Sequence, residues 1–144
     1  DKVIRKRLKL TDVMQTIELC EEVGLPVVAF FVIGLPGESI EQMRSTLLLS
    51  LELYKSYDVA SGIMVAVPFY GTRLYNLCVE KNYFSVPLTT ENLVNTTIDS
   101  PKPIICTPLF GPEDIESLSK WYFQEFDKIR SSKVSGNFPA VEEM

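Results

Sequence analysis

A run of seven apolar residues, 27–33, leads directly into the turn sequence GLPG at residues 34–37. The run is too short to cross a membrane as a helix, and its valine, isoleucine and phenylalanine residues favour a β-strand. Because both sets of alternating side chains are apolar, we expect the strand to be covered on both faces, as strands of parallel sheets are. Pro36 and Gly37 suit the second and third positions of a tight turn. The chain is therefore expected to fold around a buried parallel strand.

Residues typical of helix ends occur in the sequence both before and after this strand. Before it, Thr11 is expected to act as the N-cap of a helix that Gly24 ends. The apolar face of that helix is expected to hold Val13, Ile17, Cys20 and Val23. After the strand, Ser39 and Gln42 form the pattern of a capping box. The buried side of this second helix is expected to hold Ile40, Met43, Leu47, Leu51 and Tyr54.

The remainder of the first 82 residues continues the alternation of helices and strands. A second strand is expected at about residues 62–67, and a third helix begins after it with Thr72 as its cap. The apolar face of that helix is expected to hold Leu74, Leu77 and Cys78. Alternation of this kind implies parallel strands joined by right-handed crossovers. Residues 1–82 are therefore expected to be an α/β unit.

Residues 83–144 are expected to be a loosely structured segment plus a C-terminal helix that packs on the α/β unit. Prolines between residues 83 and 111 make a long helix there implausible. Pro112 and the acidic residues after it form a strong helix start. The last stretch, residues 131–144, is expected to be a frayed tail.

The charge of the chain is unevenly distributed. The net charge is −5, but residues 1–9 carry +4, which leaves −9 on the remainder. An acidic body disfavours binding to a phosphate backbone, so nucleic acid is not expected as a partner. The basic start is expected to be a solvated helix or linker, with a nucleic-acid patch as the alternative. No stretch of eighteen apolar residues occurs, so no membrane span is expected.

The cysteines argue against a metal site made by this chain alone. Cys20, Cys78 and Cys106 are far apart, no CxxC pattern occurs, and the chain contains no histidine. The absence of a disulfide pattern and of a secretory leader leads us to expect a cytoplasmic protein. The first residue is Asp1 rather than methionine, which suggests a fragment or a processed chain.

The strand, turn and capped helix at residues 30–39 are the best candidate for a binding site. In barrel enzymes the loop at the carboxyl end of a strand faces the active site. Gly34 and Gly37 would let a ligand approach the backbone, and the free N–H groups of residues 39–41 could meet an anionic group. The alternative is an ordinary strand-to-helix turn. Neither a GxGxxG fingerprint nor a phosphate loop occurs.

Three stretches of the chain resemble the later strands of radical S-adenosylmethionine (radical SAM) enzymes. They are GLPV at residues 24–27, FVIGLPGES at residues 31–39 and PFYGTRLY at residues 68–75. In that family a "GLPGET" turn follows one barrel strand and a "P-x-x-GT-x-LY" stretch follows the next. The resemblance covers residues 3–82, and its closest branch is the cobalamin-binding one, which includes anaerobic Mg-protoporphyrin ester cyclase. It implies the C-terminal portion of a partial (β/α) barrel with parallel strands, followed by a C-terminal helix.

The resemblance also implies cofactors and site residues. Radical SAM enzymes bind a 4Fe-4S cluster and S-adenosylmethionine, which the reduced cluster cleaves to a 5′-deoxyadenosyl radical. By this resemblance, the strand end at Ile33 and the adjacent Gly34 would lie against the adenine, and Ala66, Val67 and Pro68 would offer it backbone groups. Glu38 would brace the turn rather than transfer protons. No metal ligand and no catalytic residue is expected within this chain.

The chain departs from the family pattern where the chemistry begins, because the CxxxCxxC loop that holds the cluster is missing. The resemblance therefore implies an enzymatic parent protein, with cobalamin as a further cofactor of that parent, and an inactive isolated chain. Its expected partners are the missing N-terminal half of the barrel and a small-molecule substrate of the parent. A homodimer through exposed strand edges is also expected, with an edge covered by the basic start or by residues 83–111 as the alternative. A non-catalytic α/β ligand-binding or assembly module is the alternative function.

Overall fold

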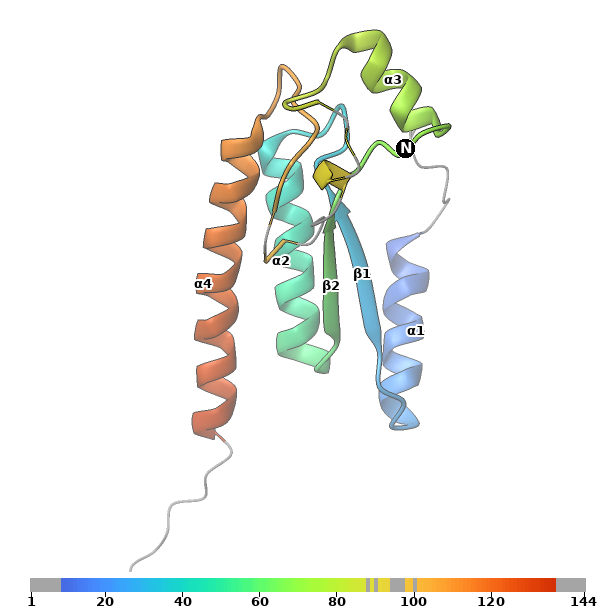
Figure 1. Ribbon diagram of the computed structural model, residues 1–144. Coiled ribbons are helices and arrows are strands. Elements are labelled where there is room, and N and C mark those ends of the chain that lie inside the picture. The colour runs from blue at the N-terminus through green and yellow to red at the C-terminus, as the bar shows by residue number, and fades with distance from the viewer. Residues whose placement is uncertain (1–8, 88, 90, 94–97, 100, 137–144) are drawn as a thin grey trace, which may run out of the picture.

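A computed structural model of the chain describes residues 9–136 except 88, 90, 94–97 and 100. Within these residues it is an α/β fold with a two-stranded parallel sheet (Figure 1). The elements in chain order are α1 (Leu10–Glu22), β1 (Val28–Ile33), α2 (Ile40–Tyr57), β2 (Ala60–Val65), α3 (Arg73–Lys81), the short 3-10 helix η1 (Glu91–Leu93) and α4 (Pro112–Gly136). The expected alternation of helices and strands up to α3 is confirmed.

The sheet forms because α2 carries the chain back to the starting end of β1, so that both strands run in the same direction. Val28 is paired with Ala60 and Ile33 with Val65, with no break in the register between them. The helix α2 contacts both strands, and α1 and α4 each contact α2. In Figure 1, α3 lies beyond the carboxyl ends of the strands, away from the long helices.

The two faces of the sheet differ in burial, which corrects the expectation that β1 is covered on both faces. The side chain of Ile33 is fully buried, and Ala29 and Phe31 of the same face are partly buried. On the opposite face, the exposed fractions are 58% for Val28 and 76% for Phe30. The physical reason is that the helices that pack on the strands do so on one face, so alternate side chains of β1 have no covering layer among the described residues. We call the uncovered face the bare face.

A single core joins the first 82 residues to the later part of the chain. Both parts of the chain contribute buried side chains to this core. The first part contributes Ile33, Met43, Leu47, Leu51, Ile63, Val65, Ala66 and Cys78, and the second contributes Ile98, Ile105, Phe110, Ile115, Leu118 and Tyr122. A smaller cluster, formed by Ile17, Leu53 and Val59, holds α1 against α2. The segment before α4 is therefore packed into the molecule by isoleucine side chains in spite of its prolines.

Of the predicted N-caps, those of α2 and α3 are confirmed and that of α1 is wrong. Ser39 Oγ accepts from Gln42 N–H while the Gln42 side chain accepts from Ser39 N–H, so the capping box is confirmed. Thr72 caps α3 through the N–H of Tyr75, as expected. Thr11 is not a cap: Lys9 holds the cap position, so α1 begins two residues earlier than expected, and Thr11 Oγ1 donates to Asp12 Oδ1 instead.

Other element boundaries also differ from the prediction. The second strand occupies Ala60–Val65 rather than residues 62–67, because Asp58 adopts a left-handed conformation that ends α2 early enough for Ala60 N–H to bond Val27 O. The last helix continues to Gly136, so its final turns lie in the region expected to fray. Val23 was placed on the buried face of α1 but is 76% exposed, since it lies past the last helical residue.

The free edge of β2 is partly covered by the later part of the chain. The bonds from Ala60 N–H to Val27 O and from Ala66 N–H to Ile33 O join β2 to β1. On the other edge, Ile98 N–H donates to Ile63 O over 3.1 Å. The 83–111 segment thus contacts the free edge of β2 at this point. No helix in the described part of the chain is long and apolar enough to cross a bilayer.

Candidate functional site

The carboxyl ends of β1 and β2 meet where the sequence placed its candidate site. Ala66 N–H donates to Ile33 O over 2.8 Å, which extends the ladder one step beyond the strands. The turn that starts at Gly34 and the loop through Val67 and Pro68 leave the sheet from this shared edge. The structure therefore brings together the five residues predicted to contact a cofactor.

Most of these five residues are already enclosed by the chain. Ile33, Gly34, Ala66 and Pro68 are buried, and only Val67 is partly exposed. The Ile33 side chain belongs to the core on the helix-covered face. A ligand at this edge would therefore meet Val67 and backbone atoms rather than the other side chains.

Two aromatic residues beside this edge were not singled out as site residues. Phe69 is 54% exposed and Tyr70 is 60% exposed, in the loop directly after Pro68. The Tyr70 ring lies 5.1 Å from the ring of Tyr75 at the start of α3. A flat ligand could stack on such rings. The signal that could have found them is their position in a loop at the carboxyl end of a strand.

Gly34 occupies a backbone conformation that other residues rarely adopt. Its φ is +82°, in the left-handed region. A Cβ at this position would lie 3.5 Å from Ile115 Cδ1 and 3.6 Å from Val65 Cγ1. The space beside Gly34 is thus lined by the protein's own side chains, and the residue is needed first for the shape of the turn.

Glu38 closes the turn by accepting a backbone hydrogen bond. Its Oε2 accepts from Leu35 N–H over 2.7 Å, and Glu38 N–H donates to Leu35 O over 3.0 Å. Burial raises the pKa of the Glu38 carboxyl, and the hydrogen bonds from the backbone N–H groups of Leu35 and Gly34 oppose that shift only in part. The carboxyl braces the turn, as the sequence led us to expect.

This raised pKa predicts a pH dependence of stability. A carboxyl whose pKa is higher in the folded state contributes stability that is lost as the pH rises through the folded pKa, because the unfolded chain then releases the proton more easily. Glu38→Gln cannot ionise, so we expect its stability relative to the wild type to increase as the pH rises from 4 to 7. Urea unfolding of both proteins across this range measures the difference. A relative stability that falls with rising pH would mean that the backbone hydrogen bonds outweigh burial.

The N-terminus of α2 has less free hydrogen-bonding capacity than the sequence suggested. Ser39 N–H, expected to be available to an anionic ligand, donates to Gln42 Oε1 over 2.9 Å. The capping box therefore satisfies one of the three donors that were assigned to an anion. This corrects the expectation that residues 39–41 all offer free N–H groups.

The cysteines do not converge on a metal or cluster site. Cys20, Cys78 and Cys106 are free thiols, and burial raises the pKa of Cys78, which disfavours its thiolate. Within the described ranges, no group of three or more histidine, cysteine, aspartate or glutamate side chains is placed to hold a metal ion. The residues present do not fit a 4Fe-4S cluster, which requires several cysteine thiolates on one side of the site.

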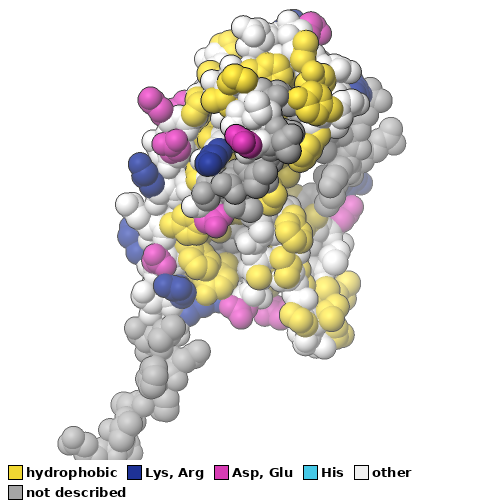
Figure 2. Space-filling view, in the orientation of Figure 1, with side chains coloured by type: hydrophobic (Ala, Val, Ile, Leu, Met, Phe, Trp, Pro, Cys, Tyr) yellow, Lys and Arg dark blue, Asp and Glu magenta, His cyan; other side chains and the backbone are white. Residues whose placement is uncertain are grey.

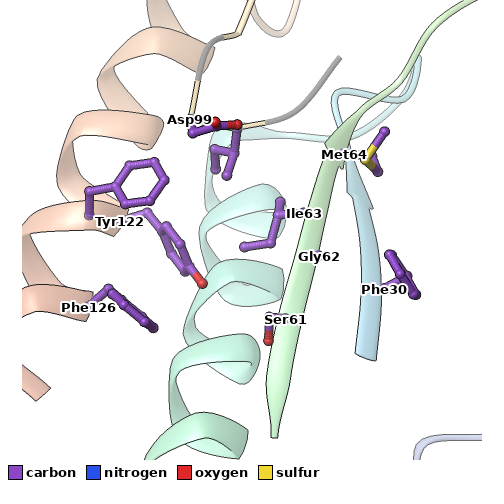
Figure 3. A pocket seen from close by; sticks show the side chains of 10 residues that line it. Phe30, Ser61, Gly62, Ile63, Met64, Asp99, Tyr122 and Phe126 are labelled. Atoms are coloured by element: carbon purple, nitrogen blue, oxygen red, sulfur yellow. The ribbon is translucent and has the colours of Figure 1, made fainter. Parts of the chain in front are cut away.

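A cavity of about 350 Å³ lies elsewhere, at the free edge of β2 (Figure 3). None of the five predicted site residues lines it. It is bordered by Ser61, Ile63 and Ile98, by Asp99, and by aromatic side chains of α4. Sequence reasoning missed this place because the residues that meet there come from distant parts of the chain.

Comparison of the chain with models of protein families, with curated proteins and with solved structures gives no match.

Proposed function

We propose that the chain is the second half of a radical SAM barrel and supplies the adenine-side wall of the S-adenosylmethionine pocket. The observation that carries the proposal is the shared carboxyl edge of two parallel strands. The GLPGES turn follows β1 and the PFYGTRLY loop follows β2, and the bond between Ala66 N–H and Ile33 O holds their starting points together. These are the positions from which barrel enzymes present their binding loops.

The bare face supports assignment of the chain to a partial barrel. Val28, Phe30 and Val32 of β1 are exposed on it, while the helices pack on the opposite face. In a βα barrel the helices form the outer layer and the other side of each strand faces the interior. The bare face then corresponds to the barrel interior, which the missing N-terminal half would close.

The cofactors belong to the parent protein under this proposal. A 4Fe-4S cluster and S-adenosylmethionine would be held mainly by the missing half, with cobalamin as a further cofactor. The described residues would contribute the backbone near Val67 and the turn at Gly34 to the adenine side. The parent is proposed to be a cytoplasmic enzyme that acts on a small molecule, and the isolated chain to be inactive.

The experiment that tests this proposal compares the chain alone with the chain preceded by its native upstream coding sequence. Reconstituted with iron and sulfide, the chain alone is expected to bind no stoichiometric 4Fe-4S cluster and to bind S-adenosylmethionine weakly at most. The extended protein is expected to contain CxxxCxxC, to show the iron–sulfur absorbance and to cleave S-adenosylmethionine under reducing conditions. An upstream sequence without that motif, or an extended protein without a cluster, would contradict the proposal.

A non-catalytic assembly module is the second candidate, and the bare face favours it. Phe30 is 76% exposed and no charged residue lies on β1 or β2. Figure 2 shows apolar side chains also reaching the surface of the molecule between charged ones. Large exposed apolar patches mark interaction sites. A homodimer through uncovered strands remains part of this candidate, and light scattering of the chain at low micromolar concentration measures it.

A further inference from the structure

Within the described residues, the free edge of β2 has unpaired backbone groups at Ser61, on the N-terminal side of its contact with Ile98. Because Ala60 and Ala66 both bond to β1, the even-numbered residues of β2 turn their backbone groups toward β1. The backbone groups of Ser61 and Ile63 therefore point to the other edge. Ile63 O accepts from Ile98 N–H, but Ser61 has no such partner at this edge among the residues that the structure describes. Among the described residues, the edge is thus covered at Ile63 and open at Ser61.

The side chain of Ser61 is a second unsatisfied group at the same place. Its Oγ is buried and has no hydrogen-bond partner. Buried hydroxyls in proteins nearly always have a partner, and one without it needs an explanation such as a missing ligand. The backbone groups at the open edge and the buried hydroxyl of Ser61 are therefore both available to hydrogen-bond a ligand at this place.

The space beside Ser61 is shaped to take an apolar side chain as well. In Figure 3, Tyr122 and Phe126 project from α4 toward β2, while Ser61 and Ile63 project from β2 toward α4. Together with Phe123 they border the cavity of about 350 Å³. Its aromatic wall is fixed in place, because Tyr122 Oη lies 3.1 Å from Ser50 Oγ and the Tyr122 ring contacts the rings of both neighbouring phenylalanines.

We propose that the free edge of β2 binds an extended peptide segment of a partner protein, which adds a third strand next to Ser61. Backbone groups of the peptide would pair with those of Ser61, and one aromatic or β-branched side chain would lie against the α4 aromatics. The bond from Ile98 to Ile63 is already a contact of this kind at the same edge. The inference goes beyond the proposed function and does not depend on it.

The negative charge around the cavity favours a peptide with basic residues. Asp99 is the charged residue in the lining of the cavity, and residues 10–144 carry a net charge of −9 once the basic start is set aside. A peptide with lysine or arginine at its ends is therefore favoured over an acidic one. A small aromatic molecule would fill the cavity but would leave the backbone groups of the Ser61 edge unpaired, which is why the extended peptide is favoured.

The test uses the full chain and a synthetic probe, the acetylated and amidated heptapeptide Lys-Val-Thr-Phe-Thr-Val-Lys. Saturable binding is measured by NMR titration, and two N-methylated versions are made, each blocking alternate backbone N–H groups. In a bound strand only one of these sets faces β2, so we expect one version to lose about tenfold or more in affinity and the other to keep it. Equal effects of both versions, or no binding, would overturn the proposal.

Substitutions in the chain test whether the peptide binds at the free edge of β2. Ser61→Pro removes the N–H at the free edge and leaves the bonds from β2 to β1 in place, so it is expected to weaken binding about tenfold. Phe123→Ala is expected to weaken it as well, whereas Leu109→Ala, at an exposed position outside the lining of the cavity, should not. Thermal melting curves show whether each variant is folded. If Ser61→Pro does not fold, the two N-methylated peptides test the proposal on the unaltered chain.

Three further outcomes would contradict the proposal. Equal affinity for N-acetylphenylalanine amide and for the peptide would identify a small-molecule pocket. An acidic peptide with glutamate in place of both lysines should bind more weakly, and tighter binding would contradict the charge argument. Self-association of the chain that Ser61→Pro abolishes would identify a second copy as the partner.

Discussion

Replacing Leu47 with alanine is expected to lower the free energy of unfolding by about 3–5 kcal/mol. Leu47 is fully buried in α2, in the core that joins β1 and β2 to the segment before α4. Truncation removes apolar contacts and leaves a cavity that the surrounding side chains fill only in part. Because domains of this size are stable by about 5–15 kcal/mol, the loss is a large part of the total. Urea unfolding followed by circular dichroism measures it.

Leu48 supplies the matched control for this prediction. It is the next residue of α2, has the same side chain and is 50% exposed. Leu48→Ala should change the free energy of unfolding by about 0.5 kcal/mol or less, as surface substitutions do. A comparable loss in both variants would mean that a partner or a self-association covers the outer side of α2. A small loss in Leu47→Ala would contradict the packing of this core.

Gly34→Val is expected to cost about 2–5 kcal/mol, the second large effect. The φ of +82° at Gly34 is unfavourable for any residue with a Cβ and most unfavourable for a β-branched one. The valine methyl groups would also crowd Ile115 and Val65, which lie within 3.6 Å of the new Cβ. The substitution therefore combines backbone strain with overpacking, and thermal and urea unfolding both measure the loss.

Gly37→Val separates these two causes. Gly37 also has a positive φ, of +97°, but a Cβ there would meet nothing within 4 Å. We expect Gly37→Val to show the backbone cost alone, about 1–3 kcal/mol, and Gly34→Val to exceed it. Equal losses would mean that Ile115 and Val65 move aside without cost. The comparison also bears on function, because a destabilised Gly34 turn would disturb the edge at which Ile33 and Ala66 meet.

Local features of the fold were predictable because their signals lie within a few residues of one another. The capping box of Ser39 and Gln42 is a four-residue pattern, and its two hydrogen bonds form as expected. The brace of the turn by Glu38 is equally local. Thr11 is not the cap because the helix begins two residues earlier than predicted, with Lys9 at the cap position, and short-range patterns do not fix a helix end that closely.

The candidate site was predictable only in its position along the chain. The motifs placed Ile33 and Ala66 at the ends of successive strands, and the parallel register made them neighbours. Which side chains enclose them could not be predicted, because Ile115 and the other residues of α4 that do so are far away in the sequence. The cavity beside Ser61 was missed for the same reason.

The sequence by itself determined that the chain alternates helices and strands, that β1 and β2 run parallel, and where turns and most caps fall, since periodicity and short-range hydrogen bonding fix these locally. Only the tertiary structure decided which faces and edges are covered. An apolar strand such as β1 has the same sequence whether one face or two are buried, and that outcome depends on how many layers pack around it. The exposure of Phe30 and the opening beside Ser61 follow from contacts between segments that no local pattern encodes.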